Sequence, residues 1–109
     1  MSGGDEYLYV LRGVRPGMVD EGPTADELAV LEAHGRYLRK LARRGVVLHA
    51  GRTQEDGARS MGLVAFRARS PEEARALMNA DPAVAQGVLK AELHSYRSAV
   101  HGAYGVRAT

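Results

Sequence analysis

One long amphipathic helix, with a histidine in its apolar face, constrains this chain more than any other feature. Thr24 followed three residues later by Glu27 is a capping-box pattern that starts a helix, and Gly45 is typical of the residue that ends one. The pattern predicts a helix over residues 24–44. Spacings of three and four place one stripe on a single face: Leu31, His34, Leu38 and Leu41. His34 therefore points toward apolar packing.

Strand-like segments lie on both sides of this helix. β-branched and aromatic residues bounded by turn signals predict strands at residues 7–14, 46–51, 61–68 and 88–96. Two prolines and two glycines predict a loop over 15–23. A polar segment with a central Asp-Gly predicts a hairpin connection over 53–60.

A second helix completes the order of elements. Ser70 before Pro71 is a helix start, which predicts a helix over 71–79, and Asp81-Pro82 begins a further short turn that Gly87 ends. The order β-α-β-β-α-β is typical of ferredoxin-like α+β domains. We therefore expect a four-stranded antiparallel sheet with both helices on one face.

The first strand predicts how the chain assembles. Tyr7, Tyr9 and Leu11 alternate with Leu8 and Val10, so both sides of this strand are apolar. Packing a second copy on the helix-free face would bury it, which predicts a homodimer whose sheets close into an α+β barrel. We expect a flexible N-terminus at 1–6, one domain at 7–97 and a C-terminal tail at 98–109.

Composition excludes several functional classes. The 109 residues include no cysteine, which removes thiolate catalysis and cysteine metal sites and fits a cytoplasmic location. No apolar run spans a membrane, and no basic and apolar leader is present. The net charge is only +2, and no aromatic residues interleave with the basic residues of the first helix, so nucleic acid is not an expected partner. Phosphate-loop motifs and short-spaced histidine pairs are absent, so we expect neither cofactor nor metal.

His34 and Asp81 are the candidate catalytic pair, and each also has a structural interpretation. A buried imidazole needs hydrogen-bond partners, and it serves either as a core residue or as an acid and base near neutral pH. Asp81 before Pro82 is a routine helix N-cap, yet a carboxylate has acceptor positions left for a second donor. If the two meet, Asp81 orients the ring and favours the imidazolium.

Several motifs in order resemble the YCII-related family. They are His34-Gly-Arg-Tyr-Leu, Gly45, Ala50-Gly51, Ser70-Pro-Glu-Glu-Ala, and the segment from Asn79 through Asp81-Pro82 to Gly87. The resemblance covers about residues 7–97. It implies a ferredoxin-like dimer of the α+β barrel superfamily, with an active site on a His–Asp pair that corresponds to His34 and Asp81. Where the family usually has proline after the Ala-Gly pair, this chain has Arg52.

The resemblance implies a small cofactor-independent enzyme. Proton transfer by His34 and Asp81 would serve an isomerase, a dehydrochlorinase-type lyase or a hydrolase acting on a small organic acid, a lactone or a hydroxylated aromatic compound. Arg52 adds a cation for an anionic group. Arg12 and Gly51 are further candidates for substrate contact.

The alternative is a homodimer that binds a small ligand or a protein without catalysis, with His34 and Asp81 purely structural. A cavity open to the His34 ring favours the enzyme, whereas a packed ring bonded to the backbone favours the binding module. Alternation does not decide whether His49 and His94 face the interior. For Tyr7 and Tyr9, packing is the default interpretation.

Overall fold

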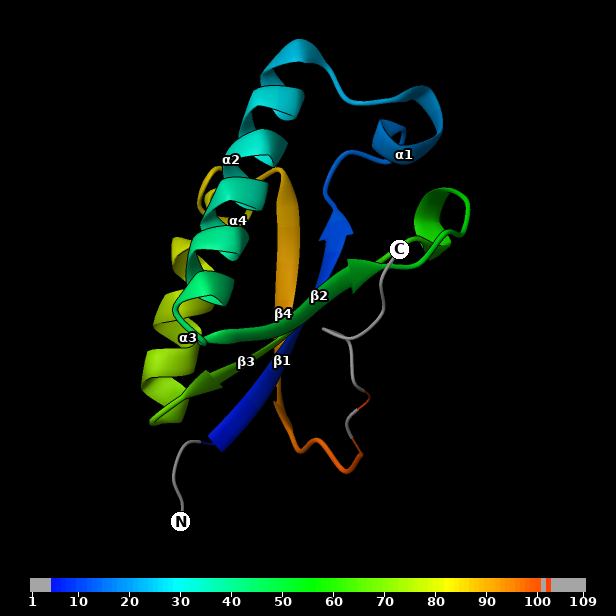
Figure 1. The fold of residues 1–109 in the computed structure, drawn as a ribbon. Helices are drawn as coiled ribbons and strands as arrows, with labels where there is room; N and C mark the ends of the chain where they lie inside the picture. The colour runs from blue at the N-terminus through cyan, green and yellow to red at the C-terminus, as the bar shows by residue number, and fades with distance from the viewer. Residues whose placement is uncertain (1–4, 101, 103–109) are drawn as a thin grey trace.

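The computed structural model describes residues 5–100 and 102. Four strands form one antiparallel sheet in the order β2-β3-β1-β4; they are β1 (Asp5–Gly13), β2 (Val47–Arg52), β3 (Gly62–Ala68) and β4 (Leu89–Tyr96). The longer helices α2 (Ala25–Arg43) and α3 (Pro71–Ala80) lie with the short α4 (Pro82–Ala85) on one face of it (Figure 1). The predicted ferredoxin-like α+β fold is confirmed.

The main helix begins and ends as its sequence predicts. The Thr24 side chain accepts a hydrogen bond from the Glu27 backbone N–H, and the Glu27 side chain accepts one from the Thr24 backbone N–H. Gly45 follows the helix with a φ of +78°, a left-handed conformation that side-chain-bearing residues rarely adopt. Local signals alone therefore fix where α2 starts and stops.

The connections contain more structure than the sequence predicts. The expected loop at 15–23 contains a single helical turn, α1 (Met18–Glu21), and the connection at 53–60 contains a 3₁₀ turn, η1 (Gly57–Arg59). Segments this short are below the length at which apolar periodicity is visible. The two turns contact each other at one end of the sheet (Figure 1).

The folded domain extends slightly beyond the predicted limits at both ends. Strand β1 begins at Asp5, so it takes in two residues of the expected N-terminal segment. Ser98, the first residue of the expected tail, donates its backbone N–H to Glu6 Oε1 at 2.7 Å. Residues 1–4, 101 and 103–109 of these two segments lie outside the described residues.

The core lies between the sheet and the helices. Tyr7, Tyr9 and Leu11 of β1 face the helices and are buried. Tyr9 packs edge-on against Phe66 of β3, with ring centroids 5.5 Å apart. These large side chains on the central strands form the apolar surface that α2 requires.

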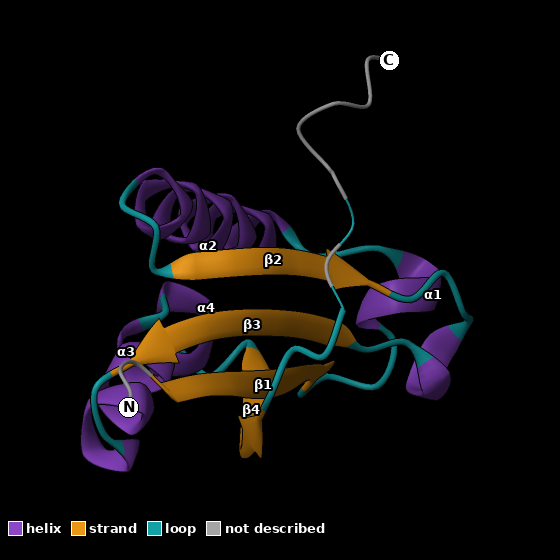
Figure 2. Cartoon of the chain, turned by 60° about the horizontal axis from the view of Figure 1, so that its bottom comes forward, coloured by secondary structure: helices purple, strands orange, loops and turns teal. Residues whose placement is uncertain are grey.

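The opposite face of the sheet is uncovered in the described part of one chain. Leu8 and Val10 lie on it, directly across from Ala65 and Leu63 of β3. Figure 2 shows α2, α3 and α4 all on the other side of the sheet. The sequence predicts burial of both faces of β1, but a single chain buries only one of them.

A bulge in β2 changes which residues of that strand face the helices. Its register against β3 shifts between Val47 and His49. Val47 pairs with buried Phe66, whereas His49 pairs with Ala65 of the uncovered face. Because the extra residue reverses the alternation, Arg52, which strict alternation from Val47 would place on the uncovered face, instead lies on the helix side.

An ion pair ties the connection after β1 to the start of α2. Arg15 donates from Nε and from one terminal nitrogen to the two oxygens of Glu27, each at 2.9 Å, and also to the Gly22 carbonyl. The hydrogen bonds from Arg15, and then that from the Thr24 N–H, lower the pKa of Glu27 to about 2. Glu27 thus caps the helix and holds the segment that carries α1.

Glu27→Gln should lower stability in a pH-dependent way. Because the pKa of Glu27 is lower in the folded chain than its ordinary value of 4.5, the contribution is complete above pH 4.5 and is lost as the pH falls toward 2. Urea unfolding of both proteins between pH 7 and 3 should show a gap that narrows at acidic pH. Glu32→Gln, an exposed position on the same helix, is the control; a gap for Glu27→Gln that stays constant would contradict the assignment.

Candidate functional site

His34 and Asp81 meet although 47 residues separate them in sequence. His34 Nδ1 lies 2.8 Å from both carboxylate oxygens of Asp81. The aspartate side chain is fully buried, and the histidine side chain is 17% exposed. Since an ionised carboxylate only accepts, the ring donates from Nδ1–H, which leaves Nε2 as the other reactive atom of the imidazole.

Asp81 is also the helix cap that its sequence context predicts. It lies between α3 and α4, where its Oδ1 accepts the Ala83 backbone N–H at 3.0 Å. The cap fixes the carboxylate at the end of α3, and α2 packs against α4, so the His34 ring comes within reach. Asp81 therefore caps α4 and contacts His34 at the same time, so its structural interpretation does not exclude the functional one.

Tyr9 is a third member of this cluster, and its hydroxyl is the feature that sequence reasoning missed. It donates to Asp81 Oδ2 at 2.7 Å from the centre of β1. Burial, followed by the charge of Asp81, raises the pKa of the Tyr9 phenol. A helix-facing tyrosine in the middle of a strand needs an acceptor for its hydroxyl, and that requirement was the available signal.

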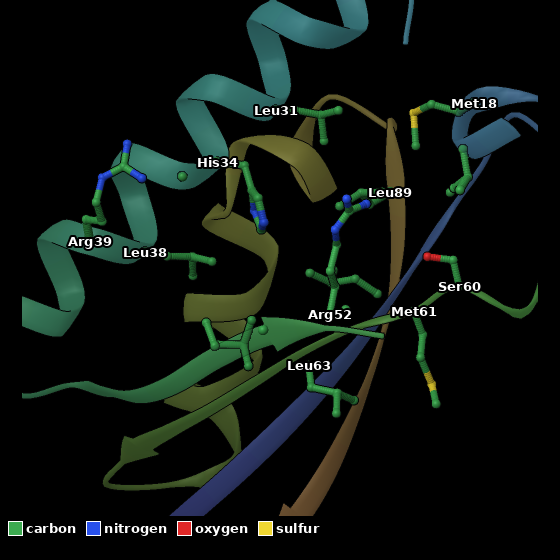
Figure 3. Close-up of a pocket in the computed structure, with 18 residues that line it drawn as sticks. Met18, Leu31, His34, Leu38, Arg39, Arg52, Ser60, Met61, Leu63 and Leu89 are labelled. Atoms are coloured by element: carbon green, nitrogen blue, oxygen red, sulfur yellow. The ribbon is translucent and has the colours of Figure 1, made fainter. Parts of the chain in front are cut away.

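A pocket of about 430 Å³ opens beside His34, between α2 and the sheet (Figure 3). Much of its wall is apolar, formed by Leu11, Met18, Leu31, Leu38, Val64 and Leu89. Gly13, Gly35, Gly51 and Gly62 line it as well. A Cβ on Gly13 would lie 2.9 Å from the Met18 methyl group, the flexible end of that side chain, which would have to shift to admit it.

Among the described residues, the pocket lining includes basic side chains and no carboxylate. His34, Arg39 and Arg52 are its ionisable residues, and Figure 3 shows His34 projecting into it from α2 and Arg52 from β2. Within residues 5–100, no carboxylate pairs with Arg52, and His34 Nε2 has no hydrogen-bond partner. The bulge in β2 puts Arg52 here, opposite Gly62, which has no side chain to obstruct it.

The other candidates from the sequence lie in different places. Gly51 lines the pocket, as noted. Arg12 does not line the pocket. It lies on the uncovered face, opposite Lys90 in the register of β1 against β4, and its guanidinium contacts Met61 Sδ at 3.6 Å. His49 and His94 lie on the same uncovered face, in register with Ala65 and Leu8 respectively. The structure therefore brings together His34, Asp81, Gly51 and Arg52, and leaves Arg12 apart.

Among the described residues, no three histidine, aspartate or glutamate side chains come close enough to share a metal ion. None of the helices there has the length and apolar character required to cross a bilayer.

Solved structures resemble this chain, and the first of them shares its fold. One is 5-chloro-2-hydroxyhydroquinone dehydrochlorinase from Burkholderia phenoliruptrix in complex with 2,5-dihydroxybenzoquinone, with a TM-score of 0.61 and 19% identity over 90% of this chain and 97% of that chain. Another, assigned as an antibiotic biosynthesis monooxygenase from Chloroflexus aurantiacus, has a TM-score of 0.44 and 18% identity over 89% and 96%. No curated protein matches the chain.

The family comparison covers most of the fold. The YCII-related domain model matches residues 11–93, from the end of β1 into β4. The matched span includes His34, Asp81 and every residue that lines the pocket. This chain therefore belongs to the YCII-related family.

Proposed function

We propose that the protein is a small enzyme that transfers a proton on a ring-shaped organic anion, with His34 as acid and base. The observation that carries the proposal is the state of the His34 ring: Nδ1 is held by a buried carboxylate, and the ring borders an open pocket. A histidine kept only for packing would have both nitrogens bonded in the core. The contact with Asp81 instead selects one tautomer and leaves Nε2 available.

The proton transfer follows from this arrangement. His34 Nε2 takes a proton from an acidic C–H or O–H of the substrate, and the electron pair of that bond stays on the substrate. Asp81 remains ionised and stabilises the imidazolium through Nδ1–H. In an isomerisation the proton returns to another substrate atom; in an elimination the leaving group departs with its bonding electrons.

The pocket supports a substrate class. A volume of about 430 Å³ is in the lower part of the range for small-molecule sites and suits a single ring. The leucine and methionine walls favour an apolar ring body, while Arg52 and the absence of carboxylates favour a negative charge on it. The quinone in the dehydrochlorinase complex is a single ring with acidic hydroxyl groups, so it combines an apolar body with a negative charge. It therefore serves as a probe of this pocket.

We also propose that the chain is a homodimer through its uncovered sheet face. Leu8, Val10 and Leu63 form a partly exposed apolar centre there, and an apolar patch of this kind favours an interface. Lys90 and Glu92 at its edge provide opposite charges that a two-fold axis can pair.

His34→Gln should abolish proton transfer. In D₂O, the wild type should accelerate exchange of the ring C–H of 2,5-dihydroxybenzoquinone, followed by proton NMR. Loss of the base should reduce the rate by at least about a hundredfold. Asp81→Asn should reduce the exchange rate as well, because an uncharged asparagine no longer orients the His34 ring or stabilises its imidazolium. His94→Gln, which alters a histidine on the other face of the sheet, is the control and should keep the wild-type rate.

Binding without turnover would contradict the proposal. If the quinone binds, as seen from line broadening, while exchange is no faster than in buffer, the pocket belongs to a binding module. A His34→Gln rate equal to that of the wild type would likewise remove His34 from the reaction.

Arg52→Gln should weaken the binding of anions selectively. A hydrogen bond to a charged group contributes about 1.5–3 kcal/mol, and since Arg52 is exposed to solvent we expect the low end, roughly a tenfold increase in Kd. Titration calorimetry should show this for 2,5-dihydroxybenzoquinone and not for neutral hydroquinone. Arg12→Gln, a cation outside the pocket, is the matched control; equal losses from both variants would indicate nonspecific attraction.

Val10→Glu should convert the dimer to monomer. The substitution puts a charge in the centre of the apolar face, next to Leu63. Arg75→Glu, on the exposed side of α3, introduces the same residue away from this face. Sedimentation velocity should give a dimer for the wild type and for Arg75→Glu and a monomer for Val10→Glu. A monomeric wild type would contradict the assembly.

A further inference from the structure

The Tyr9 hydroxyl is placed where it acts on Asp81 and on no group of the pocket. It donates to Oδ2 at 2.7 Å, while the residue itself is 2% exposed and does not line the pocket. The tyrosine approaches the Asp81 carboxylate from β1, and His34 approaches it from α2. Asp81 thus lies between a phenol in the core and an imidazole at the pocket.

The phenol serves as a fixed donor. Burial and the adjacent Asp81 charge both raise the pKa of Tyr9, so the hydroxyl keeps its proton. It has no route to substrate and exchanges no proton with it. Its only available effect on the chemistry is through the charge of the carboxylate that it contacts.

We infer that Tyr9 is a positioning residue that sets the strength of the Asp81–His34 hydrogen bond. The inference rests on the proposed function of that pair. Asp81 distributes one negative charge among three donors: the Ala83 N–H at Oδ1, the Tyr9 O–H at Oδ2, and the His34 Nδ1–H, equidistant from both oxygens. Each donor draws charge from the others, because hydrogen bonds in a low-dielectric network polarise one another.

Removing the phenol oxygen therefore has a directional consequence. Oδ2 would then have His34 as its one remaining donor among the described residues, and the charge that Tyr9 had drawn would return to the His34 contact. The Nδ1–H bond should become stronger. A tyrosine that merely fills space against Phe66 would have no such effect, since phenylalanine packs in the same place.

The chain contains a matched control in Tyr37. Its hydroxyl also lies in this region, and burial followed by the Asp81 charge raises the pKa of Tyr37 too. That hydroxyl donates to the Leu77 carbonyl at 2.6 Å and not to Asp81. Tyr37→Phe thus removes a phenol hydroxyl near the site without removing a donor to the carboxylate.

The experiment is proton NMR of the His34 Nδ1–H resonance, assigned by its loss in His34→Gln. Tyr9→Phe should move this resonance downfield, and Tyr37→Phe should leave it near the wild-type position. An unchanged resonance in folded Tyr9→Phe, or an equal shift in Tyr37→Phe, would overturn the inference.

A second measurement does not depend on the folding of Tyr9→Phe. Replacing the tyrosines of Tyr37→Phe with 3-fluorotyrosine makes the Tyr9 phenol a stronger donor, so the resonance should move upfield. A fixed resonance there would also overturn the inference. Neither readout uses a substrate, so a failure of turnover with intact NMR shifts would count against the proposed function alone.

Discussion

The buried charge of Asp81 is the constraint on which the rest of this structure depends. Removing an ionised carboxylate from water costs several kcal/mol unless donors replace the solvent. Asp81 is fully buried, and its donors come from three elements: α4 through Ala83, β1 through Tyr9 and α2 through His34. Satisfying one carboxylate therefore fixes how the main helix sits over the sheet.

The same requirement accounts for the state of the pocket. Asp81 is enclosed behind the histidine ring and does not line the pocket. Its charge is compensated by the buried hydrogen-bond donors around it. The lining is left with apolar walls, the imidazole of His34 and the cations Arg39 and Arg52. The separation gives a site in which an imidazole is supported by an anion on one side and faces an anion-attracting space on the other.

Local signals in the sequence were sufficient for the elements that carry strong caps and periodicity. The capping box at Thr24 and the spacing of the α2 stripe predicted that helix and the inward direction of His34. Asp81 was ambiguous, since Asp-Pro predicts an N-cap whether or not a histidine lies nearby. Only tertiary packing brings α2 against α4 and resolves it.

The remaining features depend on geometry that no local pattern contains. The bulge at 47–49 reverses the alternation of β2, so the directions of His49 and Arg52 could not be read from the strand itself. Arg12 was a plausible anion ligand by residue type, yet the parity of β1 places it on the uncovered face. The partner of the Tyr9 hydroxyl lies 72 residues away, beyond any local signal.

The most direct test of this account is the tautomer of His34, read from the ¹⁵N chemical shifts of its ring in the wild type and in Asp81→Asn. The account predicts that the neutral ring of the wild type carries its proton on Nδ1, with Nε2 unprotonated, and that Asp81→Asn loses this preference. A wild-type ring protonated on Nε2 when neutral would contradict it, because Nδ1 could then not donate to Asp81 and no free base would face the pocket.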